Sequence, residues 1–327
     1  MSQGEADLIG NRYFIGVDIG GTNTVVGIMD NYGSLIAKES FKTKPDGDHA
    51  VFAKKIYDFS VGLAVKAGIP MSDIAAVGAA CPGVIKDGRV VFSANLKMND
   101  VQFDEMLKQH FSVPSYVCND ANAAAFAEAI CGCGKGAHSL VAVTIGTGIG
   151  GGIVLDGKIY DGVGGAAAEI GHITVVPQGR QCACGRKGCF ECYCSATALV
   201  NDTKEAMLDN PDSKMWQVAS TISDVDGQTV FRAMKLGDGA AKKVFDRFCR
   251  YFGIGISNII TLLQPEIIVI GGGMSAEGET LVAPIRKYAS QMSLKGAFEG
   301  KTEIMAAKLG NDAGVLGAAL YAMEENK

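Results

Sequence analysis

The same short pattern occurs twice along the chain, and it constrains the fold more than any other feature. Residues 13–29 contain an apolar strand, a Gly-Gly-Thr turn and a second β-prone strand, and residues 139–155 repeat the order of strand, Gly-Thr-Gly turn and strand. Each copy predicts two antiparallel strands joined by a glycine turn. An internal repeat of this kind indicates two domains that begin alike. Backbone N–H groups of two such turns can together hold a polyphosphate.

The first turn contains side chains that suit a nucleotide. Gly20 and Gly21 let the backbone come close to a phosphate, and the hydroxyls of Thr22 and Thr24 can donate hydrogen bonds to it. Asp18, at the end of the first strand, can hold Mg²⁺ through water. The spacing differs from a P-loop, which needs Gly-Lys-Ser/Thr leading into a helix. The alternative is an ordinary β-hairpin without a ligand.

A polar pair lies between the two copies of the pattern. Asn119 and Asp120 follow a predicted strand at 116–118 and precede an Ala-rich helix predicted at 121–130. In open α/β sheets, ligands bind at this carboxyl end of the strands. A carboxylate there can take a proton from a hydroxyl group that attacks a phosphoryl group. The alternative is a purely structural role in which Asn122 caps the helix.

The segment 169–191 predicts a metal site. It contains His172, Cys182, Cys184 and Cys189, which match a closed tetrahedral site with three thiolates and one imidazole. The loop is rich in glycine and charge, so apolar burial would not order it, whereas a bound zinc ion would. We therefore expect a structural zinc ion.

Two other interpretations of this segment remain open. The cysteines could be scattered reduced thiols, or the ion could be catalytic, although four protein ligands leave no open position. Cys192 and Cys194 follow directly and could compete as ligands.

The rest of the chain alternates strands and helices, which is typical of an α/β protein. A buried strand at 266–270 runs into Gly271-Gly272-Gly273, where an adenine ring would fit against the backbone. Asn311 and Asp312 are expected to cap the last helix. The further strands are predicted at 35–41, 74–80 and 88–92, and the further helices at 48–67, 104–111, 195–208, 238–264 and 313–323.

Composition excludes several classes of protein. The net charge of −5 and the lack of any Lys/Arg run argue against a nucleic-acid partner. No apolar run reaches the ~18 residues of a membrane span. The first twelve residues contain acids and no apolar core, so we expect no signal peptide there. Ten cysteines in a chain of 327 residues, clustered and without such a signal, favour reduced thiols and a cytoplasmic protein over a disulfide framework.

In combination, these motifs resemble the ROK family (repressor, open reading frame, kinase) of the actin-like ATPase and sugar kinase superfamily. The likeness extends from about Tyr13 to Met323, and it is greatest to the pattern of bacterial ATP-dependent glucokinases. It rests on DIGGTNT at 18–24, ND at 119–120, GTGIGGG at 146–152, EIGH at 169–172 and CACGRKGCFE at 182–191.

The resemblance implies a two-domain α/β fold of the actin-like ATPase and sugar kinase type, ribonuclease H-like in its sheets. It places the active site in the interdomain cleft. We expect a smaller domain of residues 1–121 plus 311–327 and a larger one of residues 122–310 that contains the zinc loop. The family's repressors have an N-terminal helix-turn-helix, and about a dozen residues before the first strand are too few for one.

The resemblance also implies roles for single residues. Asp120 matches the general base, and His172 would bind zinc through one ring nitrogen and face the sugar with the other. ATP, Mg²⁺ and a structural Zn²⁺ are the implied cofactors, a sugar is the implied partner, and a homodimer or homotetramer is expected. The residues that match sugar-binding positions are Asn95, Asn119, Asp120, Glu169, His172 and Glu191. Those that match phosphate-binding positions are Gly20, Gly21, Thr22, Thr147 and Gly148, and Gly272 matches a position near adenosine.

The function expected from this resemblance is ATP-dependent phosphorylation of glucose to glucose 6-phosphate. After Asn95 the chain continues Leu-Lys-Met-Asn, where these glucokinases usually have Leu-Pro-Gly-Trp, so other hexoses remain open: N-acetylmannosamine, N-acetylglucosamine or fructose. Two alternatives come from other classes of protein. They are a sugar-sensing regulator that binds without turnover and a zinc-stabilised scaffold, which would leave both glycine turns unexplained.

Overall fold

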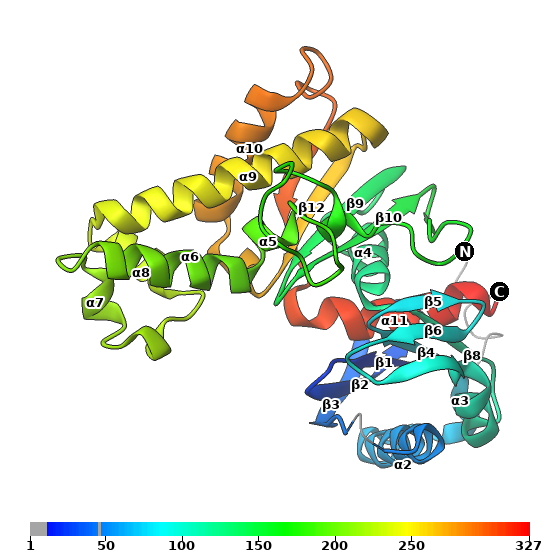
Figure 1. Cartoon of the computed structure of the whole chain (residues 1–327). Coiled ribbons are helices and arrows are strands. Elements are labelled where there is room, and N and C mark those ends of the chain that lie inside the picture. The colour runs from blue at the N-terminus through cyan, green and yellow to red at the C-terminus, as the bar shows by residue number, and fades with distance from the viewer. Residues whose placement is uncertain (1–11, 45–46) are drawn as a thin grey trace. The chain divides into compact units, whose positions relative to one another are not determined.

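The structure is a computed structural model, and it describes residues 12–44 and 47–327 (Figure 1). By internal packing the chain divides into two compact units. The first comprises Met1–His138, Gly152–Ala168 and Asn311–Lys327, and the second comprises Ser139–Gly151 and Glu169–Gly310. The segment expected not to be a signal peptide lies almost wholly in residues 1–11, outside the described residues.

The first unit is built on a five-stranded sheet in the order β3-β2-β1-β4-β8. Strands β1, β2 and β3 are antiparallel neighbours, whereas β4 and β8 run parallel to β1, so β8 is an edge strand. The bounds are Tyr13–Ile19 for β1, Asn23–Asp30 for β2, Leu35–Lys42 for β3, Ile74–Cys81 for β4 and Ser115–Asn119 for β8.

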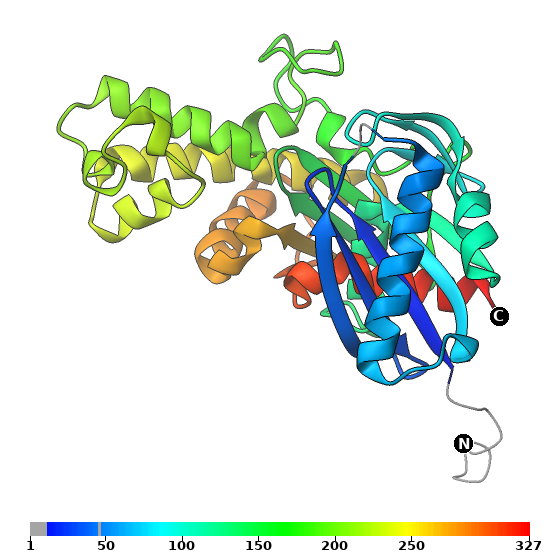
Figure 2. The same ribbon diagram turned by 90° about the horizontal axis from the view of Figure 1, so that it is seen from below.

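Helices cover both faces of this sheet, which is why β1 is apolar along most of its length. Ile15 and Val17 face the core that Phe52 and Ile56 of α2 (His49–Ala67) complete. On the opposite face, α11 (Ala313–Glu325) packs against β1 and β4 (Figure 2). The core of the first unit therefore has two layers, one on each side of the sheet.

Glycines allow the backbone of α11 to come into direct contact with the backbones of neighbouring elements. A Cβ on Gly16 would lie 2.0 Å from the carbonyl oxygen of Val315, and a Cβ on Gly78 would lie 1.9 Å from that of Ala318. Gly317 meets α4 (Asp120–Ile130) in the same way. No larger side chain fits these positions without moving the helix.

A small antiparallel sheet follows β4. It consists of β5 (Val84–Lys86), β6 (Arg89–Ser93) and β7 (Met98–Gln102), and it leads into α3 (Phe103–Phe111). Arg89 pairs with Asp100 at 2.5 Å and donates to Gln102 at 3.0 Å, which connects β6 to β7. Only β6 was predicted, because Met-Asn-Asp-Val-Gln lacks the apolar alternation of a strand.

The second five-stranded sheet has the order β11-β10-β9-β12-β13. Strands β9, β12 and β13 are parallel, and β10 forms a hairpin with β11. The bounds are Ser139–Ile145 for β9, Ile149–Leu155 for β10, Lys158–Ile159 for β11, Ile267–Gly272 for β12 and Glu303–Ala306 for β13.

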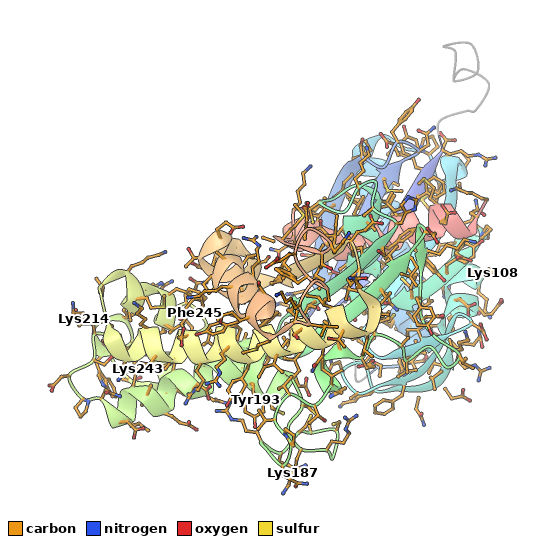
Figure 3. The ribbon with its side chains drawn as sticks, turned by 90° about the horizontal axis from the view of Figure 1, so that it is seen from above. Lys108, Lys187, Tyr193, Lys214, Lys243 and Phe245 are labelled. Carbon is orange, nitrogen blue, oxygen red and sulfur yellow. The ribbon has the colours of Figure 1, made fainter. Side chains whose placement is uncertain are left out.

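The helices of the second unit gather around the long helix α9 (Gly239–Leu263), which begins at the cap Asp238 as predicted. Figure 3 labels Phe245 on α9. Its ring lies 5.2 Å from that of Phe231. The other helices are α5 (Glu191–Cys194), α6 (Ala196–Asp209), α7 (Met215–Val218), α8 (Thr229–Lys235) and α10 (Glu279–Met292).

The two units differ from the predicted domain bounds in two segments, residues 122–138 and 152–168, which both belong to the first unit. The sequence analysis divided the chain after residue 121, whereas the first unit extends to His138 and resumes at Gly152. Helix α4 belongs to it because α4 packs against α11. That these compact units are also the functional domains stays a prediction.

The predicted helices and strands are present, with bounds shifted by a few residues at most. Two details were wrong. The cap of α4 is Asn119, whose side chain accepts from the N–H groups of Ala121 and Asn122, so Asn122 is not the cap. Asp312 precedes α11 without a side-chain cap bond, and its carboxylate pairs with Lys38 instead.

Within the described residues, none of the helices has both the length and the apolar character needed to cross a membrane.

Candidate functional site

The first glycine turn joins β1 to β2 and is held by its own backbone. The N–H of Gly20 donates to the carbonyl oxygen of Asn23 at 2.9 Å, and the hydroxyl of Thr43 donates to the carbonyl oxygen of Gly20 at 2.8 Å. Gly21 and Thr22 are exposed at the tip. Thr24 is fully buried, and its hydroxyl lies 2.8 Å from that of Thr43. Thr24 therefore supports the turn and does not present a hydroxyl to a ligand, contrary to the prediction.

Two carboxylates of the first unit, Asp18 and Asp120, both have a raised pKa. Asp18 ends β1 beside α11, where a Cβ on Gly314 would lie 2.4 Å from its Oδ2. Burial and the charge of Asp120 raise the pKa of Asp18 to about 6. Burial also raises the pKa of Asp120, while the N–H of Ala121, which donates to its Oδ1 at 2.9 Å, opposes that shift. Such a pair favours a bound cation or a shared proton.

Two asparagines of the first unit were predicted to bind the sugar, and they differ in their hydrogen bonds. Asn119 uses both ends of its amide, because its oxygen caps α4 and its nitrogen donates to the carbonyl oxygen of Gly83 at 2.9 Å. Asn95 is exposed, and its Cβ lies 3.8 Å from a Cβ built on Gly21. Asn95 thus presents a free amide next to the glycine turn.

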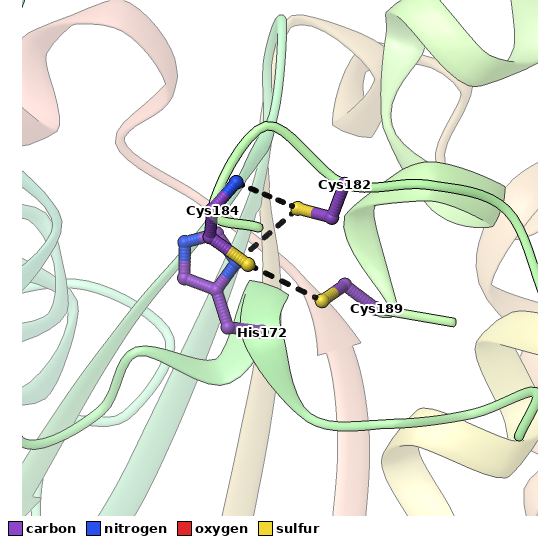
Figure 4. Close-up of side chains that lie close together, drawn as sticks. All are labelled: His172, Cys182, Cys184 and Cys189. Atoms are coloured by element: carbon purple, nitrogen blue, oxygen red, sulfur yellow. Dashed lines mark hydrogen bonds between the residues drawn. The ribbon is translucent and has the colours of Figure 1, made fainter. Parts of the chain in front are cut away.

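The predicted metal ligands converge in the second unit. The ligand atoms of His172, Cys182, Cys184 and Cys189 all lie within 4.8 Å of one another (Figure 4). Nδ1 of His172 is 3.8 Å from Sγ of Cys182, and Sγ of Cys184 is 3.7 Å from that of Cys189. In a tetrahedral site with zinc–sulfur bonds of ~2.3 Å, two sulfurs lie about 3.8 Å apart. The four residues can therefore hold a metal ion of this size.

The two neighbouring cysteines are not part of this group. The thiol of Cys192 points to the carbonyl oxygen of Gln181 at 3.7 Å, and the buried thiol of Cys194 to that of Phe248 at 3.7 Å. The four predicted ligands are thus the residues whose ligand atoms converge, and that they hold a metal ion stays a prediction.

Two glutamates flank the imidazole of His172 on opposite sides. Its Nε2 lies 4.0 Å from Oε2 of Glu169, and its Nδ1 lies 3.5 Å from Oε1 of Glu191. Oε1 of Glu191 also accepts from the thiol of Cys182 at 3.0 Å. Nδ1 of His172 thus faces the thiol of Cys182, and Nε2 faces the exposed Glu169. This is the arrangement needed if one ring nitrogen binds a metal ion and the other binds a sugar.

The second glycine turn lies close to Glu191 in the same unit. A Cβ on Gly148 would lie 2.6 Å from Oε2 of Glu191, and Thr147 is exposed beside it. Gly272, at the end of β12, has φ +84° and would bring a Cβ within 2.2 Å of the carbonyl oxygen of Ile145. Only glycine fits there, because a side chain would meet the backbone of the neighbouring strand β9. That adenosine lies near Gly272 stays a prediction.

A cluster that the sequence analysis missed anchors the metal loop. The N–H of Arg180 donates to the hydroxyl of Tyr193 at 2.6 Å, and its guanidinium donates to the carbonyl oxygen of Cys192 at 3.0 Å. The same guanidinium pairs at 2.5 Å with Asp202, which is 4% exposed and also pairs with Arg247 at 3.2 Å. These partners are far apart in sequence, and no local pattern could have indicated them.

The predicted residues therefore form two groups, one in each unit. The first unit brings Asp18, Gly20, Gly21, Thr22, Asn95, Asn119 and Asp120 to one end of β1, β4 and β8 and the adjoining turns. The second unit contains Thr147, Gly148, Glu169, His172, Cys182, Cys184, Cys189, Glu191 and Gly272.

Comparison with known proteins gives one consistent family. The family model described as "ROK family" matches residues 14–325. The chain is 35% identical to a glucokinase of Halalkalibacterium halodurans over 97% of both chains, and 34% identical to one of Streptomyces coelicolor over 95% of this chain and 97% of that one. It also resembles the crystal structure of a ROK family glucokinase from Streptomyces griseus in complex with glucose and AMPPNP, with 34% identity, a TM-score of 0.80 and coverage of 96% of this chain and 100% of that one. The chain belongs to the ROK family.

Proposed function

We propose that this protein transfers the γ-phosphoryl group of ATP to the 6-hydroxyl of glucose, with Asp120 as the general base. Likeness to glucokinases over nearly the full length supports sugar phosphorylation by a ROK kinase. The observation that carries the assignment to Asp120 is its place at the junction of β8 and α4, with a pKa raised by burial. A carboxylate with a raised pKa is better matched to accepting a proton near neutral pH.

The sugar hydroxyl needs this base because it does not ionise near neutral pH. As the oxygen–phosphorus bond forms, the hydroxyl proton moves to Asp120 and the ADP oxygen leaves. Asp120 forms no covalent bond to phosphorus, so it contributes only by accepting the proton and by orienting the sugar hydroxyl. The other residues position the reactants.

The two glycine turns are proposed to hold the phosphates of ATP. Gly21 and Thr22 in the first unit and Thr147 and Gly148 in the second would supply N–H groups and exposed hydroxyls. Gly20, whose own N–H donates to Asn23, would let the first turn come close to the phosphates. Asp18 would hold Mg²⁺, which neutralises phosphate charge and would lower the raised pKa of this carboxylate. That these groups meet in an interdomain cleft remains a prediction.

Asn95, Asn119, Glu169, His172 and Glu191 are proposed to bind the sugar hydroxyls. A zinc ion on His172 and the three cysteines would fix the direction of the imidazole, and through it the sugar side of the loop. The chemistry that zinc supplies is structural, because four protein ligands fill its coordination.

A panel of sugars tests the proposal. Purified protein is given ATP, Mg²⁺ and glucose, fructose, N-acetylglucosamine or N-acetylmannosamine at matched concentration, and ADP release is followed by a coupled assay. Glucose is expected to give the highest kcat/KM. A higher kcat/KM for another sugar would make that sugar the substrate and leave the assignment as a kinase intact. Saturable glucose binding without ADP release in the presence of any of the sugars would favour a regulator.

A further inference from the structure

Thr43 is the first residue after β3, and three hydrogen bonds connect it to the hairpin of β1 and β2 (Figure 1). Its N–H donates to the carbonyl oxygen of Thr22 at 2.9 Å, and its hydroxyl donates to that of Gly20 at 2.8 Å. The same hydroxyl oxygen lies 2.8 Å from the hydroxyl oxygen of Thr24. A residue outside the glycine motif therefore contacts three residues of the motif.

The direction of each hydroxyl bond follows from its chemistry. A carbonyl oxygen can only accept, so the one hydroxyl proton of Thr43 is used on Gly20. Thr24 must then donate to the hydroxyl oxygen of Thr43. Thr24 and Thr43 are 0% and 8% exposed, and buried polar groups are costly to leave without a partner. The bond from Thr43 to Gly20 is thus supported from behind by a second buried hydroxyl.

The bond to Gly20 also sets the direction of a donor on the same peptide unit. Every peptide bond in residues 12–44 and 47–327 is trans. A trans peptide is planar, so the carbonyl group of Gly20 and the N–H group of Gly21 point in opposite directions. Because Thr43 holds the carbonyl oxygen, the N–H of Gly21 points away from Thr43. Gly21 itself is exposed.

The two glycines of the turn therefore differ in what they can offer a ligand. The N–H of Gly20 is already used, because it donates to the carbonyl oxygen of Asn23 at 2.9 Å. The N–H of Gly21 lies on the exposed part of the turn, and a backbone N–H group in such a turn is suited to an anion. The hydroxyl of Thr43 is the group that holds this N–H in one direction.

We propose that Thr43 is a positioning residue for ATP, whose hydroxyl directs the N–H of Gly21 towards a phosphate oxygen. Thr43 is buried and does not itself touch the nucleotide. This inference rests on the proposed role of the first glycine turn in holding phosphate. It adds a residue that lies beyond the turn in sequence and that acts only through the backbone of Gly20 and Gly21.

Thr43→Val tests the hydroxyl, because valine keeps the shape of the side chain. The backbone bond from Thr43 to Thr22 remains in this variant. We expect KM for ATP, measured with saturating glucose and Mg²⁺, to rise about tenfold, because a hydrogen bond to a charged group is weakened. KM for glucose at saturating ATP should stay within twofold. Thr43→Ser keeps the hydroxyl and should keep both KM values within twofold.

Thr302→Val is the matched control. Thr302 is also buried, and its hydroxyl donates to the carbonyl oxygen of Pro265 at 2.7 Å within the second unit. The same replacement there removes the same kind of bond and leaves both glycine turns intact. Neither KM value should change. An increase in KM for ATP as large as that of Thr43→Val would mean that loss of any buried hydroxyl is sufficient, and would refute the positioning role.

Calorimetry separates the binding of phosphate from damage to the fold. ADP with Mg²⁺ contains phosphate groups, whereas adenosine contains none. Thr43→Val should bind ADP about tenfold more weakly than the unchanged protein does, and adenosine equally well. Equal loss of affinity for both compounds would contradict an action through the phosphates.

A second variant applies if the valine methyl group prevents folding. Thr43→Ala removes the hydroxyl without placing an atom against the carbonyl oxygen of Gly20, and the same increase in KM for ATP is expected. If either folded variant phosphorylates glucose with KM for ATP within twofold of the unchanged protein, this inference is wrong and the proposed function stands. If the unchanged protein neither phosphorylates a sugar nor binds ADP, the proposed function fails, and this inference fails with it.

Discussion

Asp120 is the residue on which the proposed chemistry depends most. Asp120→Asn keeps the oxygen that accepts from Ala121 and removes the ability to take a proton. We expect kcat to fall by about 10²- to 10⁴-fold, the usual range for loss of a general base. Glucose affinity, measured by calorimetry, should change little. A variant that keeps more than a tenth of its turnover would remove Asp120 as the base.

Asp18 gives a prediction for stability against pH. Its folded pKa of about 6 lies above the usual value of 3.8, so the folded state binds a proton more tightly than the unfolded state. Stability from this group is therefore fully present below pH 3.8 and is lost as pH rises through 6. A shift of this size corresponds to at most about 3 kcal/mol.

Asp18→Asn should remove this dependence. In magnesium-free buffer at pH 7.5 we expect the variant to be more stable than the unchanged protein by about 1–3 kcal/mol. Near pH 4 the difference should shrink towards zero. Urea unfolding at several pH values measures it, and two parallel stability curves would show that Asp18 is not the group responsible. Added Mg²⁺ should stabilise only the unchanged protein.

At the scale of elements, the metal loop supplies a comparison between neighbouring cysteines. Cys189→Ser removes a predicted ligand, so metal analysis should find well below one zinc ion per chain, and turnover should fall with it. Cys192→Ser makes the same replacement of sulfur by oxygen at a cysteine three residues further on, outside the four converging residues. This variant should keep one zinc ion. If both variants keep zinc, or both lose it, the ligand set is wrong.

The anchor of this loop can be tested separately. Asp202 is buried between Arg180 and Arg247, so Asp202→Asn should loosen the segment that leads to Glu191. We expect KM for the sugar to rise about tenfold while KM for ATP stays within twofold, and a chelator should remove zinc faster. Arg186→Lys, at an exposed site in the same loop, is the control and should change neither.

The elements predicted from sequence are those whose pattern is local. The hairpin of β1 and β2, the capped helix α9 and the four metal ligands follow from apolar runs, caps and spacing. The sequence analysis missed α10, which contains Pro284, and the short strand β13. Val51 and Val65 of α2 are apolar and yet 65% and 73% exposed, so apolar character alone does not define the buried face of that helix.

The parts of the candidate site that escaped prediction depend on distant partners. The hydroxyl of Thr24 turns inward because the hydroxyl of Thr43, which follows β3 in the chain, accepts from it while donating to Gly20. Asp202 holds Arg180 of the metal loop and also pairs with Arg247 of α9. Such contacts join residues far apart in sequence, and no spacing rule describes them.

At the scale of the whole molecule, the tight seating of α11 gives a prediction about the first unit. Gly78→Ala would place a methyl group 1.9 Å from the carbonyl oxygen of Ala318. Overpacking of this kind typically costs about 1–3 kcal/mol, and the thermal midpoint should fall. Gly62→Ala in α2 has no atom within 4 Å and should be neutral or stabilising. A Gly78→Ala protein as stable as Gly62→Ala would contradict this packing.

The return of the chain to its first unit also has a consequence for biosynthesis. The strands of residues 13–119 leave the ribosome early, but the face of their sheet that α11 covers stays bare until residues 139–310 have been translated. The second unit lies in between and can complete its own packing sooner. Folding on the ribosome would then finish where it began, and a nascent chain halted near residue 300 would expose an apolar sheet face open to chaperones.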